Sequence, residues 1–138
     1  MNRRDLQTLT KLRLREARSL LRAGYYEGSY YLAGYAIECA LKACIAKQVK
    51  RFDFPDKKFW NDSYTHDFGK LLSISGLKQH HEQECQKDKQ FALNWALVSA
   101  WNVEDRYALS VSRAEAHEIY RCISTRRSGV MSWLKKSW

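Results

Sequence analysis

The sequence of 138 residues predicts an all-α protein built as a helical bundle. It contains one proline and six glycines, and its longest uninterrupted stretches are rich in alanine, leucine, lysine, arginine and glutamate, which are good helix formers. Its apolar residues recur at helical spacing. A chain of this length can bury a core of its own, so we expect a single domain over residues 1–138.

The first predicted helix covers about residues 5–23 and ends at Gly24, a typical C-terminal glycine. It is amphipathic, with apolar side chains along one broad arc: Leu6, Leu9, Ala17, Leu20 and Leu21. Cations align on the opposite side: Arg4, Lys11, Arg15, Arg18 and Arg22. We interpret this basic stripe as a solvated face, and the alternative is a surface that follows phosphates.

The second predicted helix, about residues 27–50, is apolar nearly all round, which predicts the central helix of the bundle. Small residues on one side let a neighbouring helix approach closely: Ala33, Ala36, Ala40 and Ala43. A narrow polar stripe interrupts the middle of the helix, with side chains on one face: Tyr31, Tyr35, Glu38 and Lys42. A buried carboxylate needs a partner, and Lys42, one turn from Glu38, can partly supply it. The stripe is our candidate wall for a site.

The rest of the chain predicts a loop and three helices. The loop covers residues 51–64 and carries aromatic side chains among lysines, either to stack on single-stranded bases or to cover the bundle: Phe52, Phe54, Phe59, Trp60 and Tyr64. A short helix then lies between His66 and Gly76, and we expect His66 to bond locally. A fourth helix covers about residues 87–101. A fifth begins after Ser112, where Ser-Arg-Ala-Glu matches a capping box.

Arg106 lies in the connection between the fourth and fifth helices, in the segment WNVEDRY. Apolar residues flank this segment, so we expect Arg106 beside the core. Its guanidinium offers five donors in a rigid fork that suits a carboxylate or a phosphate. Glu38 is the internal partner that we favour, and a phosphate of RNA or of a nucleotide is the alternative.

The composition limits the classes of function. The 24 lysines and arginines against 15 acids give a net charge of +9, which favours a polyanion or an acidic protein as partner. We see no membrane span and no signal peptide, and we expect a cytoplasmic protein. The four cysteines have irregular spacings and no CxxC pair, which predicts reduced thiols, no metal site and no cofactor. We interpret the segment around His80, His81 and Cys85 as solvated and polar.

Three segments together resemble the HEPN family of prokaryotic helical domains. They are the second helix from Tyr31 to Ala43, the start of the third helix with His66, Asp67, Phe68, Leu71 and Leu72, and the late group of Trp101, Glu104, Arg106 and Tyr107. The resemblance implies a four- to five-helix up-and-down bundle that often forms a homodimer. It also implies roles in toxin–antitoxin, abortive-infection and RNA-defence systems, often beside a nucleotidyltransferase partner.

Catalytic members of that family are metal-independent ribonucleases in which an arginine is followed, after four to six residues, by a histidine. This chain departs from the motif, because ten residues separate Arg106 from His117 and three separate Arg113 from His117. Arg113, His117 and Arg121 do share one face of the fifth helix, for which a solvated face is the simpler interpretation.

We therefore expect a HEPN-type protein that binds RNA, a nucleotide or a partner protein without an intact ribonuclease motif. The candidate binding residues are Tyr31, Tyr35, Glu38, Lys42, His66, Arg106, Tyr107, Arg113 and Arg121. One alternative is a ribonuclease with a rearranged site, in which Arg106 holds phosphate and His117 or His66 transfers the proton. The other is a purely structural interaction module.

Overall fold

The fold is known from a computed structural model that describes residues 1–49, 54 and 56–138. This part of the chain contains no strand and is built from α-helices and one 3-10 helix, η1. Their bounds are α1 Arg3–Ala23, α2 Tyr26–Gln48, α3 Lys57–Asp62, α4 Phe68–Ile74, α5 Lys78–Lys87, α6 Lys89–Ser99, η1 Val103–Tyr107, α7 Arg113–Ser124 and α8 Val130–Leu134. The predicted all-α class is confirmed.

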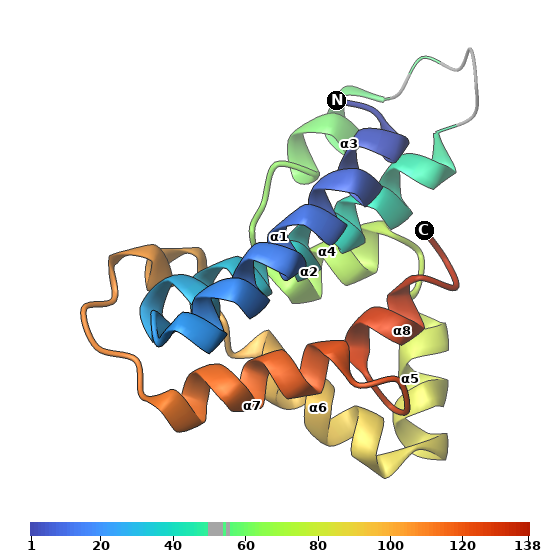
Figure 1. The fold of residues 1–138 in the computed structure, drawn as a ribbon. Coiled ribbons are helices and arrows are strands. Elements are labelled where there is room, and N and C mark those ends of the chain that lie inside the picture. Colours follow the sequence, from blue (N-terminus) through green and yellow to red (C-terminus); the bar gives the residue numbers. More distant parts are fainter. Residues whose placement is uncertain (50–53, 55) are drawn as a thin grey trace.

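Helices α1 and α2 form a long antiparallel hairpin (Figure 1). Asn2 begins α1 with a capping box, in which its side chain and that of Asp5 each accept a hydrogen bond from the other's backbone N–H. Gly24 ends α1 in the left-handed conformation at φ 84°, as the sequence predicts. The buried Ser29 hydroxyl then donates to the Ala17 carbonyl at 2.8 Å, which ties the two helices together.

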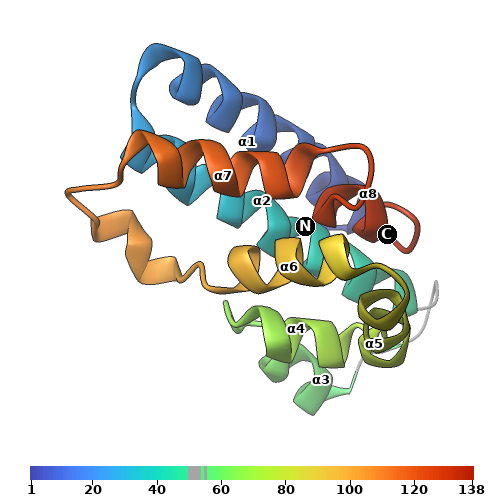
Figure 2. The ribbon, with the colours of Figure 1, turned by 90° about the horizontal axis from the view of Figure 1, so that it is seen from below.

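Helix α2 is the centre of the molecule, as its apolar circumference predicts. It packs against α1, α4, η1, α7 and α8, and the four alanines of its small-residue side are all fully buried. Figure 2 shows α1 and α7 along one side of the molecule and α3 and α4 along the other. The middle of α2 therefore lies between other elements of the fold.

The fourth and fifth predicted helices correspond to α6 and α7. Helix α6 is slightly shorter than predicted, because the Asp88 side chain caps it by accepting a hydrogen bond from the Phe91 N–H at 3.1 Å. Helix α7 begins at Ser112 as predicted, and the Ser112 hydroxyl accepts from the Glu115 N–H at 3.1 Å. The Glu115 carboxylate accepts a hydrogen bond from the same hydroxyl instead of closing the box on the backbone.

The predicted loop over residues 51–64 contains a helix that the sequence analysis missed. Asp56 caps α3 by accepting a hydrogen bond from the Lys58 N–H. Phe52, among residues 50–53 and 55, lies outside the described residues. Phe59 packs against the core, while Trp60 and Tyr64 are 51% and 71% exposed. One of these aromatic side chains therefore covers the bundle, while the base-stacking role of the exposed ones stays a prediction.

The segment around His81 is also helical, and it is not fully solvated. His81 lies on α5 with its ring centroid 4.5 Å from that of Trp95, 5.6 Å from Trp133 and 5.7 Å from Phe91. Burial among these rings lowers the pKa of His81. The prediction of a solvated segment fails for this residue because its apolar partners come from α6 and α8. His80, the preceding residue, is exposed as expected.

None of the helices in the described residues is both long and apolar enough to cross a membrane. The last helix, α8, buries Val130, Met131 and Leu134 in the core.

Candidate functional site

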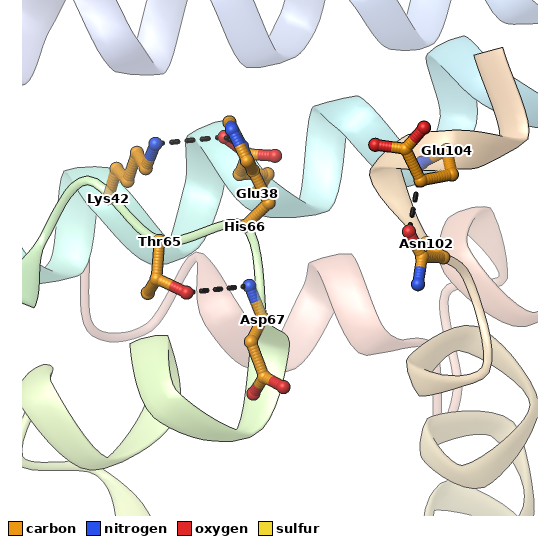
Figure 3. A network of polar contacts seen from close by, with 7 residues as sticks. All are labelled: Glu38, Lys42, Thr65, His66, Asp67, Asn102 and Glu104. Carbon is orange, nitrogen blue, oxygen red and sulfur yellow. Dashed lines mark hydrogen bonds and ion pairs between the residues drawn. The ribbon is translucent and has the colours of Figure 1, made fainter.

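The polar stripe of α2 meets a histidine from a distant part of the chain. Glu38 is 2% exposed, and its Oε1 accepts a hydrogen bond from the Lys42 ammonium at 2.8 Å. The same oxygen lies 2.9 Å from Nδ1 of His66 (Figure 3). The pairing of Glu38 with Lys42 is confirmed. The expected local bond of His66 is wrong, because the tertiary fold brings the ring to a carboxylate 28 positions earlier in the chain.

Local structure fixes the position of His66 directly before α4. Asp67 caps α4 by accepting from the Lys70 N–H at 2.8 Å, and its own N–H donates to the Thr65 hydroxyl at 3.2 Å. Phe68 anchors the start of the helix in the core at 4% exposure. The His66 side chain remains 50% exposed. One edge of its ring therefore faces Glu38 while the residue stays accessible to solvent.

A row of aromatic rings lies beside this pair. Tyr31 stacks on Tyr35 at 6.1 Å between centroids and on Trp101 at 5.8 Å, and Trp101 stacks on Phe68 at 5.2 Å. Trp101 lies directly on Gly34, where an added Cβ would come within 2.2 Å of the indole. Burial raises the pKa of Tyr35, which keeps its hydroxyl neutral. The rings form a wall from α2 to α4.

Two buried polar atoms of the site have no hydrogen-bond partner among the described residues. They are Oε2 of Glu38, an acceptor, and Nε1 of Trp101, a donor. A buried polar group without a partner is costly, so such atoms are few in native proteins and each calls for an explanation. Trp101 packs against Gly34, one turn before Glu38 on α2, so donor and acceptor belong to the same cluster.

Arg106 does not pair with Glu38, and the expectation of a place beside the core is wrong. Arg106 is exposed on η1, and its guanidinium carbon lies 4.8 Å from the ring centre of Tyr107, which is also exposed. The start of η1 is set by Asn102, whose side chain accepts from the Glu104 N–H at 2.9 Å (Figure 3). Lys42 and His66 are the partners of Glu38 instead.

Three of the predicted residues lie on α7, apart from this cluster. Arg113, His117 and Arg121 are exposed, and His117 and Arg121 line a shallow hollow together with Glu118. The His117 ring lies 6.4 Å from that of Tyr26. No contact within the described residues joins these side chains to Glu38. The predicted residues therefore separate into three groups. Tyr31, Tyr35, Glu38, Lys42 and His66 form, together with Trp101, the Glu38 site; Arg106 and Tyr107 are the η1 pair; and Arg113, His117 and Arg121 are the α7 face.

The Glu38 site can exchange a proton or hold a polar ligand. A carboxylate at Nδ1 favours the tautomer with the proton on that nitrogen, which leaves Nε2 as an acceptor. Lys42 adds a positive charge at 23% side-chain exposure. The described residues contain no group of three or more side chains arranged to ligate a metal. The chemistry visible here is that of an oriented imidazole beside aromatic rings.

Gly34 and the packing role of Trp101 were missed by the sequence analysis. A glycine in the middle of an otherwise strong helix signals a close approach by another group, and Gly34 is such a residue. The partner of His66 left no such signal, because neither spacing nor periodicity links residues 28 positions apart.

Comparison with known proteins gives the family. No curated protein and no solved structure matches the chain. A model of the HEPN domain matches residues 10–136, a span that contains the Glu38 site, the η1 pair and the α7 face. Since this match covers most of the sequence, the chain belongs to the HEPN domain family.

Proposed function

We propose that this HEPN protein binds RNA or a nucleotide at the Glu38 site. The observation that carries the proposal is the His66 ring, which a buried carboxylate orients at 2.9 Å while the side chain stays half exposed. The family is associated with ribonuclease, defence and toxin–antitoxin roles. We propose further that this protein acts in a toxin–antitoxin or defence system.

The surroundings of His66 suit a nucleotide. Nε2 of the ring can accept a hydrogen bond from a ribose hydroxyl or a base, and Tyr31 and Tyr35 are partly exposed rings on which a base can stack. Arg106 and Tyr107 lie on η1, which packs against α2, and Arg106 supplies an exposed guanidinium for a phosphate. The net charge of +9 attracts the polyanion.

A metal-independent ribonuclease is the second candidate, and the contact between Glu38 and His66 favours it. A carboxylate that orients an imidazole is the arrangement of a general base. His66 would take the proton of the ribose 2′-hydroxyl as that oxygen bonds to phosphorus. The bond from phosphorus to the 5′-oxygen of the next nucleotide would break, and that oxygen would take its proton from water. His117 has no carboxylate contact of this kind among the described residues, so its catalytic role stays a prediction from the sequence.

Binding of fluorescein-labelled single-stranded RNA, followed by anisotropy, tests the proposal. We expect His66→Ala to weaken binding about tenfold, the effect of losing one well-placed hydrogen bond. Arg106→Ala should weaken it by a similar factor. His80→Ala removes an exposed histidine on α5 and is the matched control, which should bind as the wild type does. Equal binding by wild type and His66→Ala would refute the proposed site.

The same variants separate binding from cleavage. Incubation of the wild type with labelled RNA and a chelator should leave the RNA intact if the protein only binds. Chelator-resistant cleavage that disappears in His66→Ala, and persists in His117→Ala, would establish the second candidate instead.

We also propose a homodimer and a nucleotidyltransferase partner, since the family resemblance implies both. Light scattering on the purified protein tests the first, and an untagged purification that identifies co-purifying proteins and nucleic acid tests the second. A monomer that purifies alone would contradict both.

A further inference from the structure

The outer face of α1 carries a line of positively charged side chains. Its members are all exposed: Arg4, Lys11, Arg15, Arg18 and Arg22. At 100° per residue they fall within an arc of about 60°, and at a rise of 1.5 Å per residue they span about 27 Å of the helix. The line therefore follows the helix axis for most of its length.

The acids of α1 do not neutralise this line. Asp5 is engaged in the capping box with Asn2, and Glu16 forms an ion pair with Arg13 at 2.6 Å, off the line of cations. Within residues 1–49, 54 and 56–138, none of the five cations forms an ion pair. Two exposed hydroxyls flank the line, on Thr8 and Ser19. The face offers donors and positive charge without a competing carboxylate from its own helix.

The fold extends this line onto the C-terminal segment. Nζ of Lys11 lies 5.8 Å from the ring centre of Trp138, and Nζ of Lys135 lies 5.9 Å from the same centre. Residues 119–138 contain no acid, and Lys135 and Lys136 are both exposed. Two ammonium groups from distant parts of the sequence therefore converge on one indole. An anion beside this ring would be attracted by both ammonium groups.

We propose that this surface, the α1 stripe (Arg4, Lys11, Arg15, Arg18, Arg22, Lys135 and Lys136), binds the sugar–phosphate backbone of RNA. A length of about 27 Å corresponds to about eight phosphates of one strand at about 3.4 Å per nucleotide. Four of the five members of the stripe on α1 are arginines, whose planar forks bind phosphate in a bidentate manner. Thr8 and Ser19 are further phosphate donors, and Trp138 offers a partly exposed ring for an unpaired base.

The proposed ligand of the α1 stripe is the RNA of the proposed function, so this inference rests on that function. The stripe and the Glu38 site have no residue in common. The Glu38 site would recognise a nucleotide by hydrogen bonds and stacking. The stripe would hold the backbone by charge and would release counterions on binding. The two contributions therefore differ in their dependence on salt.

The test measures RNA affinity against salt concentration for two double variants of the full chain, Lys11→Gln/Lys135→Gln and Arg15→Gln/Arg18→Gln. Each removes two charges from the stripe. For a single strand we expect the slope of log K against log salt to fall by about 1.4 in each, from about 0.7 per phosphate contact. Lys78→Gln/Lys89→Gln removes two exposed lysines from α5 and α6 as the matched control and should keep the wild-type slope.

The outcomes separate the two proposals. His66→Ala should weaken binding without changing the slope, so a failure of the Glu38 site leaves the stripe intact. Stripe variants with the slope of the control would overturn the stripe. A wild type that binds no RNA would also overturn it. A wild type that binds polyglutamate through the stripe in preference to RNA would overturn it as well, and would indicate an acidic protein partner. If a double variant does not fold, Arg15→Gln alone should lower the slope by about 0.7.

Discussion

At the scale of single residues, Glu38 shows how a buried charge is kept inside a helical core. Its carboxylate is 2% exposed, and Lys42 and His66 both contact the same oxygen. Removing one partner of a buried charge leaves the other uncompensated, which usually costs more than the pair contributes. Substitution of Glu38, Lys42 or His66 therefore disturbs the other two residues as well.

Gly34 is a residue at which packing against Trp101 excludes a side chain. In Gly34→Ala the new Cβ would lie 2.2 Å from the Trp101 indole, so the ring must move. We expect the free energy of unfolding to fall by about 1–3 kcal/mol, the usual cost of overpacking, although alanine favours a helix by about 0.5–1 kcal/mol over glycine. Urea unfolding followed by circular dichroism measures the change.

Gly28→Ala on the same helix is the matched control for Gly34→Ala. A Cβ there would lie 3.2 Å from a terminal methyl of Leu20, which can move aside. We expect its stability to stay close to that of the wild type. Equal losses of unfolding free energy in Gly34→Ala and Gly28→Ala would contradict a specific effect of the contact with Trp101.

At the scale of elements, local chemistry sets the ends of some helices and tertiary contacts hold others. Gly24 and Ser112 mark helix ends that the sequence predicts, and the structure adds Asn2 as the cap at the start of α1. Helices α5 and α8 have no side-chain cap at their start, and they are held by aromatic contacts instead. The Trp133 ring of α8 lies 5.3 Å from Phe91 of α6 and 5.6 Å from His81 of α5.

The docking of α5 should depend on pH through His81. Burial lowers the pKa of His81 in the folded protein, so the unfolded chain, with a value of about 6.5, binds the proton more readily. Stability is then fully present above about pH 6.5 and is lost as the pH falls through the folded value. We expect a lower free energy of unfolding at pH 5 than at pH 7.5. Denaturant unfolding at the two pH values measures it.

His81→Phe keeps an aromatic ring among Phe91, Trp95 and Trp133 and cannot take up a proton. It should reduce the loss of stability between pH 7.5 and pH 5. His80→Gln, at the exposed neighbouring position, should leave that loss unchanged. A pH dependence that is the same in His81→Phe and in the wild type would assign the effect to other groups.

At the scale of the whole molecule, α2 is the central helix, and the reactivity of the cysteines measures how well the core around it is shielded from solvent. Burial raises the pKa of Cys39 and of Cys44 to about 11 each, so both thiols are protonated at neutral pH. Cys122 is buried on α7, and Cys85 on α5 is partly exposed. With iodoacetamide at pH 8, we expect Cys85 to react first and the other three to react only on global unfolding. Peptide mass spectrometry measures each rate.

Cys44 gives this experiment a second use, because its thiol lies 3.7 Å from the Leu134 carbonyl of α8. Labelling of Cys44 ahead of Cys39 would show that α8 detaches by itself. Labelling of Cys39 in the native protein at the rate of Cys85 would contradict a central α2.

The sequence by itself determined the helical class, the central position of α2 and the polar stripe with its pair of Glu38 and Lys42, because these depend on spacing within one helix. Only the tertiary structure decided that His66 contacts Glu38, that Arg106 faces solvent, that His81 lies among rings and that Lys11 lies near Trp138. Each of these joins or separates residues on different elements. Periodicity describes which face of a helix is buried, whereas the partner on that face depends on how the helices pack.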